Sequence, residues 1–238
     1  RIEIIRGPGS ALYGENAFLA VINIITYDAE DIDGVKVSSG YGSFDTYEEN
    51  VAFGKKYGKV NISGMAHYRQ TSGFNGTVES DAQTILDSTL SPFGFPMASQ
   101  APGKVEDWRQ EYNINLKVTY DDLYFQGWYE DKNRGPFVGP HYALNDETNI
   151  GGNYVFGEVG YKKTFEEMFT LNPRVYYDQF DTDLCVEALP EGVTLPVDTN
   201  GDGVYDKLNT YRDGIIGNLA VSEKVVGTEI PFDYIPFD

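Results

Sequence analysis

The sequence predicts an all-β fold, a transmembrane antiparallel β-barrel, on three observations. Several segments alternate apolar and polar residues along their length. The apolar faces of these segments end on tyrosine, which occurs 18 times in 238 residues. The connections between the segments are short at one end and long at the other. Together these features are typical of strands that cross a lipid bilayer as a barrel.

The clearest predicted strand runs from Glu111 to Tyr120. One face of it is wholly polar, and the other face carries Tyr112, Ile114, Leu116, Val118 and Tyr120. Side chains of a strand point alternately to opposite faces, so the segment has one side suited to lipid and one suited to water. The apolar side begins and ends on Tyr, whose amphipathic ring suits the two membrane interfaces. Its length matches the roughly 9–11 residues of a tilted membrane strand.

The same pattern predicts seven further strands. In chain order they are Val35–Tyr41, Thr46–Lys55, Val60–Arg69, Leu123–Glu130, Tyr154–Lys162, Phe169–Asp178 and Ile215–Val226. A soluble β-sandwich is the alternative, because any half-buried sheet alternates. The repeated terminal tyrosines, and the charged and amide residues on the opposite faces, favour a barrel with a wet lumen. No stretch of 18 or more apolar residues occurs, which excludes a transmembrane helix.

The lengths of the connections support the barrel independently. Short connections are predicted at Lys56–Lys59, Asp121–Asp122 and Phe165–Glu167, and long ones at Ser72–Asp107, Asn133–Gly152 and Thr182–Asp213. Outer-membrane barrels have short periplasmic turns and long external loops. The long loops are therefore expected to face outside, and the short loop Gly42–Asp45 is the one exception among them.

The net charge, the few cysteine and histidine residues and the absence of catalytic motifs limit the possible functions. The formal net charge of -19 argues against a nucleic-acid partner. The single Cys185 excludes a disulfide within this chain, leaving an isolated thiol or a pairing with a cysteine outside it. The two histidines, His67 and His141, lie in different regions, which disfavours a two-histidine metal or haem site. No nucleophile elbow, zinc-protease motif or P-loop occurs, so no enzyme activity is predicted.

The first 33 residues differ from the strands that follow. RIEIIR alternates isoleucine with charge, glycines stand at positions 7, 9 and 14, and AVINIIT forms a second strand-like run. Physics alone gives only a small strand–turn–strand unit here. The stretch RIEIIRGPGSALYGENAFLAVINIIT, however, closely resembles the end of the plug domain in TonB-dependent outer-membrane receptors. Ala20 stands where that family usually has Gly, and an acidic linker, Tyr27–Asp33, follows.

This resemblance implies the architecture. Residues 1–33 are expected to be the C-terminal end of a plug domain with its linker, and residues 34–238 the first part of a barrel. The family's barrel has 22 strands, so about eight of them would be present here. The chain has no initiator Met, and we expect it to be a fragment. An open arc of strands leaves unpaired edges in lipid, so the fragment alone is expected to misassemble.

The resemblance also implies a function and a location. A member of this family would lie in the bacterial outer membrane as a monomer among its lipids. It would import a scarce nutrient, driven through the TonB protein, which a segment outside this chain would contact. An iron–siderophore leads among ligands as the commonest class, with cobalamin or another chelate as the alternatives. Two rival functions remain: a passive eight-stranded pore or adhesin, and a secreted calcium-binding β protein.

The expected site residues fall into three groups. The charged plug residues expected to contact the barrel wall are Arg1, Glu3 and Arg6, and the motif residues expected to be structural are Gly7, Pro8, Gly14 and Asn23. The candidates for ligand contact in the lumen or at its rim combine aromatic rings with polar groups, as small-molecule sites do. They are Trp108, Trp128, Tyr154, Phe156, Arg174 and Tyr176.

A separate motif, DTNGDGVYD, lies in a predicted outer loop. It offers oxygen ligands at Asp198, Asn200, Asp202 and Asp206, and at the Val204 carbonyl. This spacing matches the start of a calcium loop, although Asn209 stands where an EF-hand has Glu. A structural Ca²⁺ in this loop is therefore expected, with a plain acidic turn as the alternative. No other cofactor is required.

Overall fold

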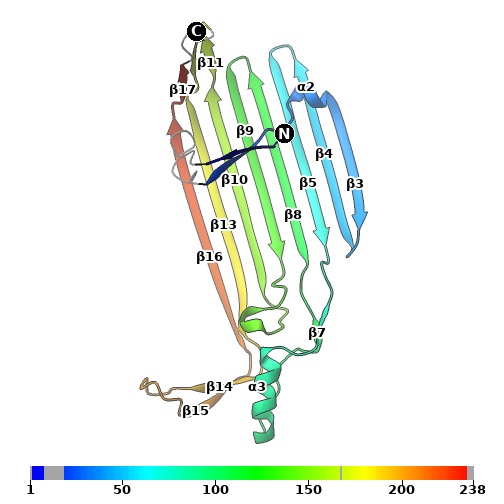
Figure 1. The fold of residues 1–238 in the computed structure, drawn as a ribbon, viewed down its shortest axis with the longest axis vertical. Coiled ribbons are helices and arrows are strands. Elements are labelled where there is room, and N and C mark those ends of the chain that lie inside the picture. Colours follow the sequence, from blue (N-terminus) through cyan, green and yellow to red (C-terminus); the bar gives the residue numbers. More distant parts are fainter. Residues whose placement is uncertain (1, 8–18, 167, 235–238) are drawn as a thin grey trace.

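The computed structural model describes residues 2–7, 19–166 and 168–234. An antiparallel sheet of eight strands dominates them (Figure 1). Its strands are, from one edge to the other, β3 (Gly34–Gly42), β4 (Thr46–Tyr57), β5 (Val60–Thr71), β8 (Arg109–Tyr120), β9 (Leu123–Arg134), β10 (Asn149–Tyr161), β13 (Arg174–Leu189) and β16 (Ile215–Glu229). Each strand pairs with the sheet strands next to it in chain order. The predicted antiparallel β fold is confirmed.

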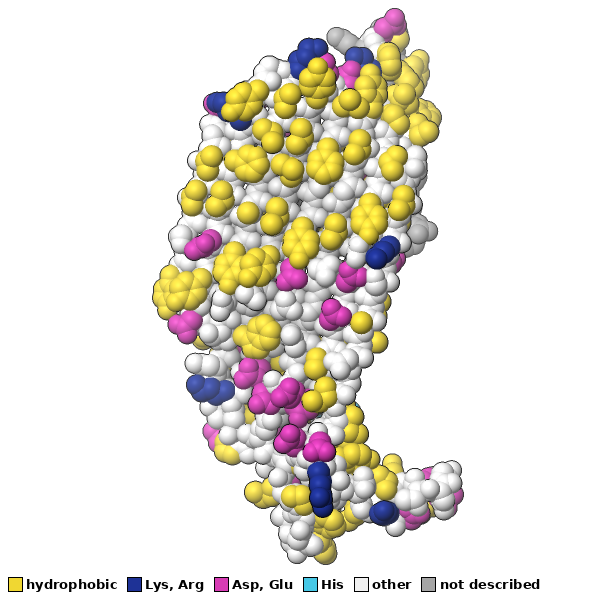
Figure 2. All heavy atoms as spheres, turned by 180° about the vertical axis from the view of Figure 1, so that it is seen from behind, with side chains coloured by type: hydrophobic (Ala, Val, Ile, Leu, Met, Phe, Trp, Pro, Cys, Tyr) yellow, Lys and Arg dark blue, Asp and Glu magenta, His cyan; other side chains and the backbone are white. Residues whose placement is uncertain are grey.

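The register gathers the apolar residues on one face of the sheet. Ile114 lies opposite Ala66 on β5 and Tyr129 on β9, and Tyr112 lies opposite Tyr68. Figure 2 shows these apolar rows from behind, with acidic side chains gathered below them. From Tyr112 to Tyr120 the strand covers about 27 Å, or roughly 20 Å of height at a tilt of about 40°. The apolar band is therefore close in height to the roughly 25 Å band of membrane barrels.

These apolar side chains lie on the surface of the sheet. Ile114 is 51% exposed and Val35 is 69% exposed. The buried apolar residues among the described ranges are few, namely Ala29, Val105, Ala143, Leu144 and Val193. A sandwich would cover this face with a second sheet, whereas a membrane strand leaves it to lipid. No helix in the described part of the chain is long and apolar enough to cross a membrane.

The short turns are built by residues in left-handed backbone conformations. The two-residue turn between β8 and β9 is Asp121-Asp122, with Asp121 at φ 48°, and the β4–β5 turn has Gly58 at φ 61°. Two-residue hairpin turns favour such angles, which Gly and Asp tolerate best. The Lys59 ammonium lies 2.6 Å from the Asp121 carboxylate and links the two turns.

Two prolines interrupt strands near the end of the sheet that carries the short turns. The prediction of one continuous strand from Phe169 to Asp178 is therefore wrong. Pro173 separates β12 (Phe169–Leu171) from β13, and Pro231 separates β16 from β17 (Phe232–Tyr234). Proline has no N–H to donate to a ladder, so the pairing pauses. Strands β11 (Lys163–Phe165), β12 and β17 form a small sheet beyond the break, with the Phe169 ring packed against two neighbouring Phe rings.

The predicted long loops contain secondary structure. The expected loop from Thr182 is wrong in its first part, because β13 continues to Leu189 before the hairpin of β14 (Val193–Val197) and β15 (Lys207–Tyr211). The loop after β5 holds β6 (Thr77–Val78), α3 (Ala82–Leu90), η1 (Ser91–Phe93) and β7 (Gly103–Lys104), and the loop after β9 holds η2 (Pro140–Tyr142). All of these lie at the end of the sheet opposite the short turns (Figure 1).

The N-terminal segment forms a hairpin and a short helix on the polar side. Strand β1 (Ile2–Arg6) pairs with β2 (Ala20–Ile24), and α2 (Ala29–Ile32) follows. The hairpin crosses in front of the large sheet in Figure 1, the side opposite the apolar face of Figure 2. Gly7 has φ 107°, and its N–H donates to the Leu19 carbonyl at 2.9 Å. The described part of the N-terminal segment, which we call the plug segment from its predicted role, therefore lies on the side expected to be the lumen.

Candidate functional site

Three of the predicted ligand-contact residues meet on the polar face, and we call Trp128, Tyr154 and Phe156 the lumenal cluster. Trp128 on β9 lies directly opposite Phe156 on β10. The Trp128 and Tyr154 rings pack edge-on, with centroids 5.7 Å apart at 79°. The Tyr154 hydroxyl donates to the Asp178 carboxylate at 3.0 Å. The rings are thereby held in place on two neighbouring strands.

A cleft of about 330 Å³ separates this wall from the end of the plug segment. Thr26, two residues after β2, lines it from the plug side. The wall side combines Trp128 and Phe156 with the polar Asn115, Lys117 and Gln126. Aromatic surface with a few directed polar groups is the usual composition of a small-molecule site.

The other predicted ligand-contact residues lie elsewhere. Arg174 donates to Glu229 at 2.9 Å and lies 3.6 Å from Glu158, so its charge is already paired. Tyr176 faces Glu158 across the ladder, further toward the turn end than the lumenal cluster. Trp108 precedes β8 at the opposite, loop end, where its carbonyl accepts the Gly135 N–H at 3.0 Å. The structure thus brings together half of the predicted set.

The plug residues are only partly described. Arg1, Pro8 and Gly14 lie outside the described residues. Glu3 pairs in register with Asn23 within the hairpin, and Arg6 pairs with Ala20 and is exposed. Their contacts with the barrel wall stay a prediction.

The sequence analysis did not predict how the linker is held. Three ion pairs join it to the strands of the large sheet. Lys117 lies 2.7 Å from Asp28, Lys55 lies 2.7 Å from Asp33, and Lys56 pairs with Glu30. Asp28 and Asp31 also form a capping box that starts α2. A signal existed in the sequence, since an acidic linker precedes strands that carry lysine near one end.

Close packing also holds this helix against the sheet. Ala29 is 4% exposed, with its backbone directly over Gly54 of β4. A Cβ atom at position 54 would lie 2.8 Å from the Ala29 carbonyl oxygen and 2.8 Å from the Ile32 Cβ. Only glycine leaves room for this contact.

The outer loops are held together by two buried carboxylates. Asp81 caps α3 through the Thr84 N–H at 2.8 Å and also accepts the Leu144 N–H from the next loop at 2.9 Å. Asp87 accepts the N–H groups of Ala98 and Ser99 at 2.8 and 2.7 Å. Burial raises the pKa of Asp81, but these donors outweigh it and hold the pKa below its ordinary value. We call this assembly the loop platform.

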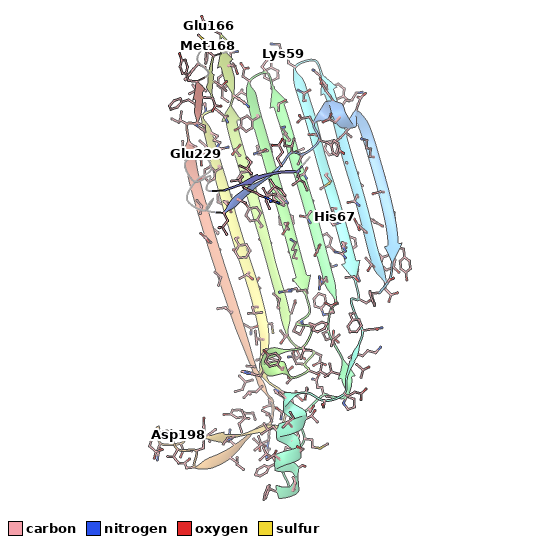
Figure 3. All side chains as sticks on the ribbon, viewed as in Figure 1. Lys59, His67, Glu166, Met168, Asp198 and Glu229 are labelled. Atoms are coloured by element: carbon pink, nitrogen blue, oxygen red, sulfur yellow. The ribbon has the colours of Figure 1, made fainter. Side chains whose placement is uncertain are left out.

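The predicted calcium motif lies in the β14–β15 hairpin, away from the sheet (Figure 3). The Asp198 carboxylate accepts N–H groups from Asn200, Gly201 and Gly203 at 3.1, 2.7 and 2.7 Å. These donors, that of Gly203 first, hold the pKa of Asp198 below its ordinary value.

The remaining oxygen groups of the motif are engaged with one another and with the backbone. Asp202 bonds Asn200 and the Val204 N–H, while Asp206 accepts from Thr199. Within the described ranges no three His, Cys, Asp or Glu side chains are grouped to hold a metal. Calcium binding in this loop stays a prediction.

His67, His141 and Cys185 are well separated in the fold. His67 lies on β5 (Figure 3), 3.5 Å from Glu48, whereas His141 belongs to η2 in the outer loops. Cys185 lies on β13 opposite Asn149 and Asn218 and is a free thiol.

Comparison with known proteins relates the chain to a transporter. No family model matches the chain. It is 38% identical over 151 residues to the vitamin B12 transporter BtuB of Vibrio vulnificus (strain CMCP6). The match covers 63% of this chain and 22% of that relative, so the chain spans less than a quarter of its length.

The fold defines the class of protein. A meandering antiparallel sheet with a lipid-suited outer face, and with a hairpin and helix seated on its inner face, is part of an outer-membrane β-barrel. The relationship to BtuB, together with the plug motif, supports the TonB-dependent receptor family for this chain. A location in the bacterial outer membrane fits both findings.

Proposed function

We propose that the protein containing this chain imports a cobalamin-type nutrient across the outer membrane, with energy delivered through TonB. It does so as a monomer surrounded by outer-membrane lipid. The expected iron–siderophore gains no support from the relative, whose name gives vitamin B12 as its cargo. We therefore rank cobalamin first and keep a ferric siderophore as the competing substrate.

The observation that carries this proposal is the cleft between the end of the plug segment and the lumenal cluster. It joins aromatic surface with amide and ammonium groups at the point where the plug meets the wall. A ligand held there would contact both the barrel and the part of the protein that has to move. A passive pore needs no segment at this position, and a secreted β protein needs no lipid-suited face.

The test is uptake of radiolabelled cyanocobalamin by cells that lack their own outer-membrane cobalamin transporter. We expect the full-length gene to restore uptake in cells with TonB and to fail in cells without it. Uptake that is independent of TonB would support the passive pore. Uptake of a ferric siderophore, with none of cobalamin, would keep the import class and overturn the substrate.

A pair of tryptophan variants tests the cleft itself. Trp128→Ala should weaken cyanocobalamin binding about tenfold, since buried aromatic contacts dominate binding free energy. Trp108→Ala is the matched control, because it removes the same side chain at the loop end, outside the cleft. Equal losses in both variants would contradict the role of the lumenal cluster.

A further inference from the structure

A second cavity, of about 350 Å³, lies among the outer loops. Its walls are largely apolar and come from three separate segments, with Leu86 of α3, Leu144 of the 135–148 loop and Leu189 of β13 among them. The polar residues in its lining include Gln83, Asn145 and Glu187. This volume falls within the range of small-molecule sites.

The cavity walls are fixed by buried hydrogen bonds. The loop platform joins α3 to the 135–148 loop through the Asp81 carboxylate and the Leu144 N–H. The Thr148 hydroxyl then accepts the Glu187 N–H at 3.0 Å, which joins that loop to β13. The three segments therefore form one preformed wall, so a ligand would not have to order them first.

One carboxylate oxygen of Glu187 is left without a hydrogen bond by this arrangement. Glu187 lies two residues beyond Cys185, the last β13 residue to pair with β10, and is 6% exposed. Its Oε2 atom is buried and has no hydrogen-bond partner among the described residues. By contrast, Gln83 is bonded to Asp87 at 2.7 Å, and Asn145 accepts the Thr148 N–H at 3.2 Å.

The charge around Glu187 indicates what would satisfy it. Burial raises the pKa of its carboxyl, and the negative charges of Asp146 and Glu147 raise it further. A buried carboxylate among like charges is costly unless it is paired with a positive group or protonated. Among the residues that the structure describes, no basic side chain lines the cavity except His141, which is exposed. The missing positive group would therefore come from outside these residues.

We infer that this cavity binds a small organic cation, an ammonium group on an apolar body, with Glu187 as the counter-ion. The apolar body packs against the leucines, and the ammonium N–H donates to Oε2. The site is separate from the lumenal cluster, and the inference does not rest on which nutrient is imported.

The test uses benzylammonium on the full-length protein in detergent, with benzyl alcohol as the uncharged and benzoate as the anionic analogue. Calorimetry should show saturable binding of benzylammonium, and at least tenfold weaker binding of the other two probes. Glu187→Gln should weaken benzylammonium binding at least tenfold while removing an unpaired buried charge, so the loops should remain folded. Glu79→Gln is the matched control, because it removes an exposed charge of the same loops that neither lines the cavity nor is among the charges that raise the pKa of Glu187.

A second variant keeps the test independent of Glu187. Ala82→Phe should fill the cavity and also weaken benzylammonium binding at least tenfold. The inference is wrong if benzyl alcohol binds as tightly as benzylammonium, or if Glu187→Gln leaves binding unchanged. It is equally wrong if calcium alone displaces the probe from the parent protein, because the carboxylate would then serve a metal.

Discussion

Replacing Gly54 by alanine should loosen the helix that follows the plug. The new Cβ atom would lie 2.8 Å from both the Ala29 carbonyl oxygen and the Ile32 Cβ, where ordinary contacts begin at about 3.4 Å. The overlap of roughly 0.6 Å has to be relieved by moving α2 away from β4. Overpacking of this kind typically costs about 1–3 kcal/mol.

Hydrogen exchange of the α2 amides in the full-length protein measures this cost directly. The Asp33 N–H donates to the Ala29 carbonyl at 3.0 Å and reports whether the helix is closed. A loss of about 1–3 kcal/mol in local opening free energy corresponds to roughly 5- to 150-fold faster exchange.

Gly40→Ala is the matched control, since Gly40 also lies in a strand of the sheet. A Cβ there has its nearest neighbour at 3.9 Å, an ordinary contact. We expect its exchange at α2 to match the parent protein. Unchanged exchange in Gly54→Ala, or an equal change in the control, would refute the packing argument.

Four further outcomes are expected in the full-length protein. Asp81→Ala leaves the buried Leu144 N–H without its acceptor, so the stability of the outer loops should fall by about 1–3 kcal/mol. The loops should then become sensitive to protease, whereas a variant at an exposed loop residue should stay resistant. Because the folded pKa of Asp81 lies below its ordinary value of 3.8, its contribution is complete above that value and is lost as the pH falls through the folded pKa. The part of the loop protection that depends on Asp81, measured as the difference between the parent protein and Asp81→Ala, should therefore be constant from about pH 5 to 8 and shrink below about pH 4; loss of this difference near neutral pH would contradict this. Lys117→Met removes a largely exposed ion pair with Asp28, so α2 exchange should rise less than about fivefold. Calcium should slow cleavage in the β14–β15 hairpin of the parent protein and leave Asp198→Asn unaffected; equal cleavage with and without calcium would favour the plain acidic turn.

The membrane strands could be predicted because their faces are dictated locally. The alternation around Ile114 fixes which side meets lipid, and any slip of register by one residue would reverse it. Pro173 was wrongly predicted to lie within a continuous strand, although proline has no N–H to donate and therefore indicates a break in the ladder. In the outer loop, Asp81 followed by Thr84 was an available capping signal for α3 that the loop composition obscured.

The candidate sites depended more on tertiary structure. The alternation of side chains along each strand was enough to place Trp128 and Phe156 on the polar face. It could not predict that the two residues lie opposite each other, because that depends on the register between β9 and β10. The match between Gly54 and Ala29 joins residues whose contact depends on how α2 docks on the sheet, which no local pattern specifies. The same holds for Glu187, whose isolation arises only when three loop segments meet around it.

The chain-order pairing of the large sheet also governs how quickly it can form. Only two residues connect β8 to β9, so these strands can pair with little loss of chain entropy. Pairing of β5 with β8 requires closing the long loop between Thr71 and Arg109. The entropy lost on closing a loop grows by about 0.6 kcal/mol for each doubling of its length. Hairpins at the turn end are therefore expected to form early, and joining β5 to β8, across the longest connection within the sheet, is expected to be slower. The nine-residue helix α3 shortens the flexible path across that gap, so its capping by Asp81 bears on the rate of assembly as well as on the finished loops.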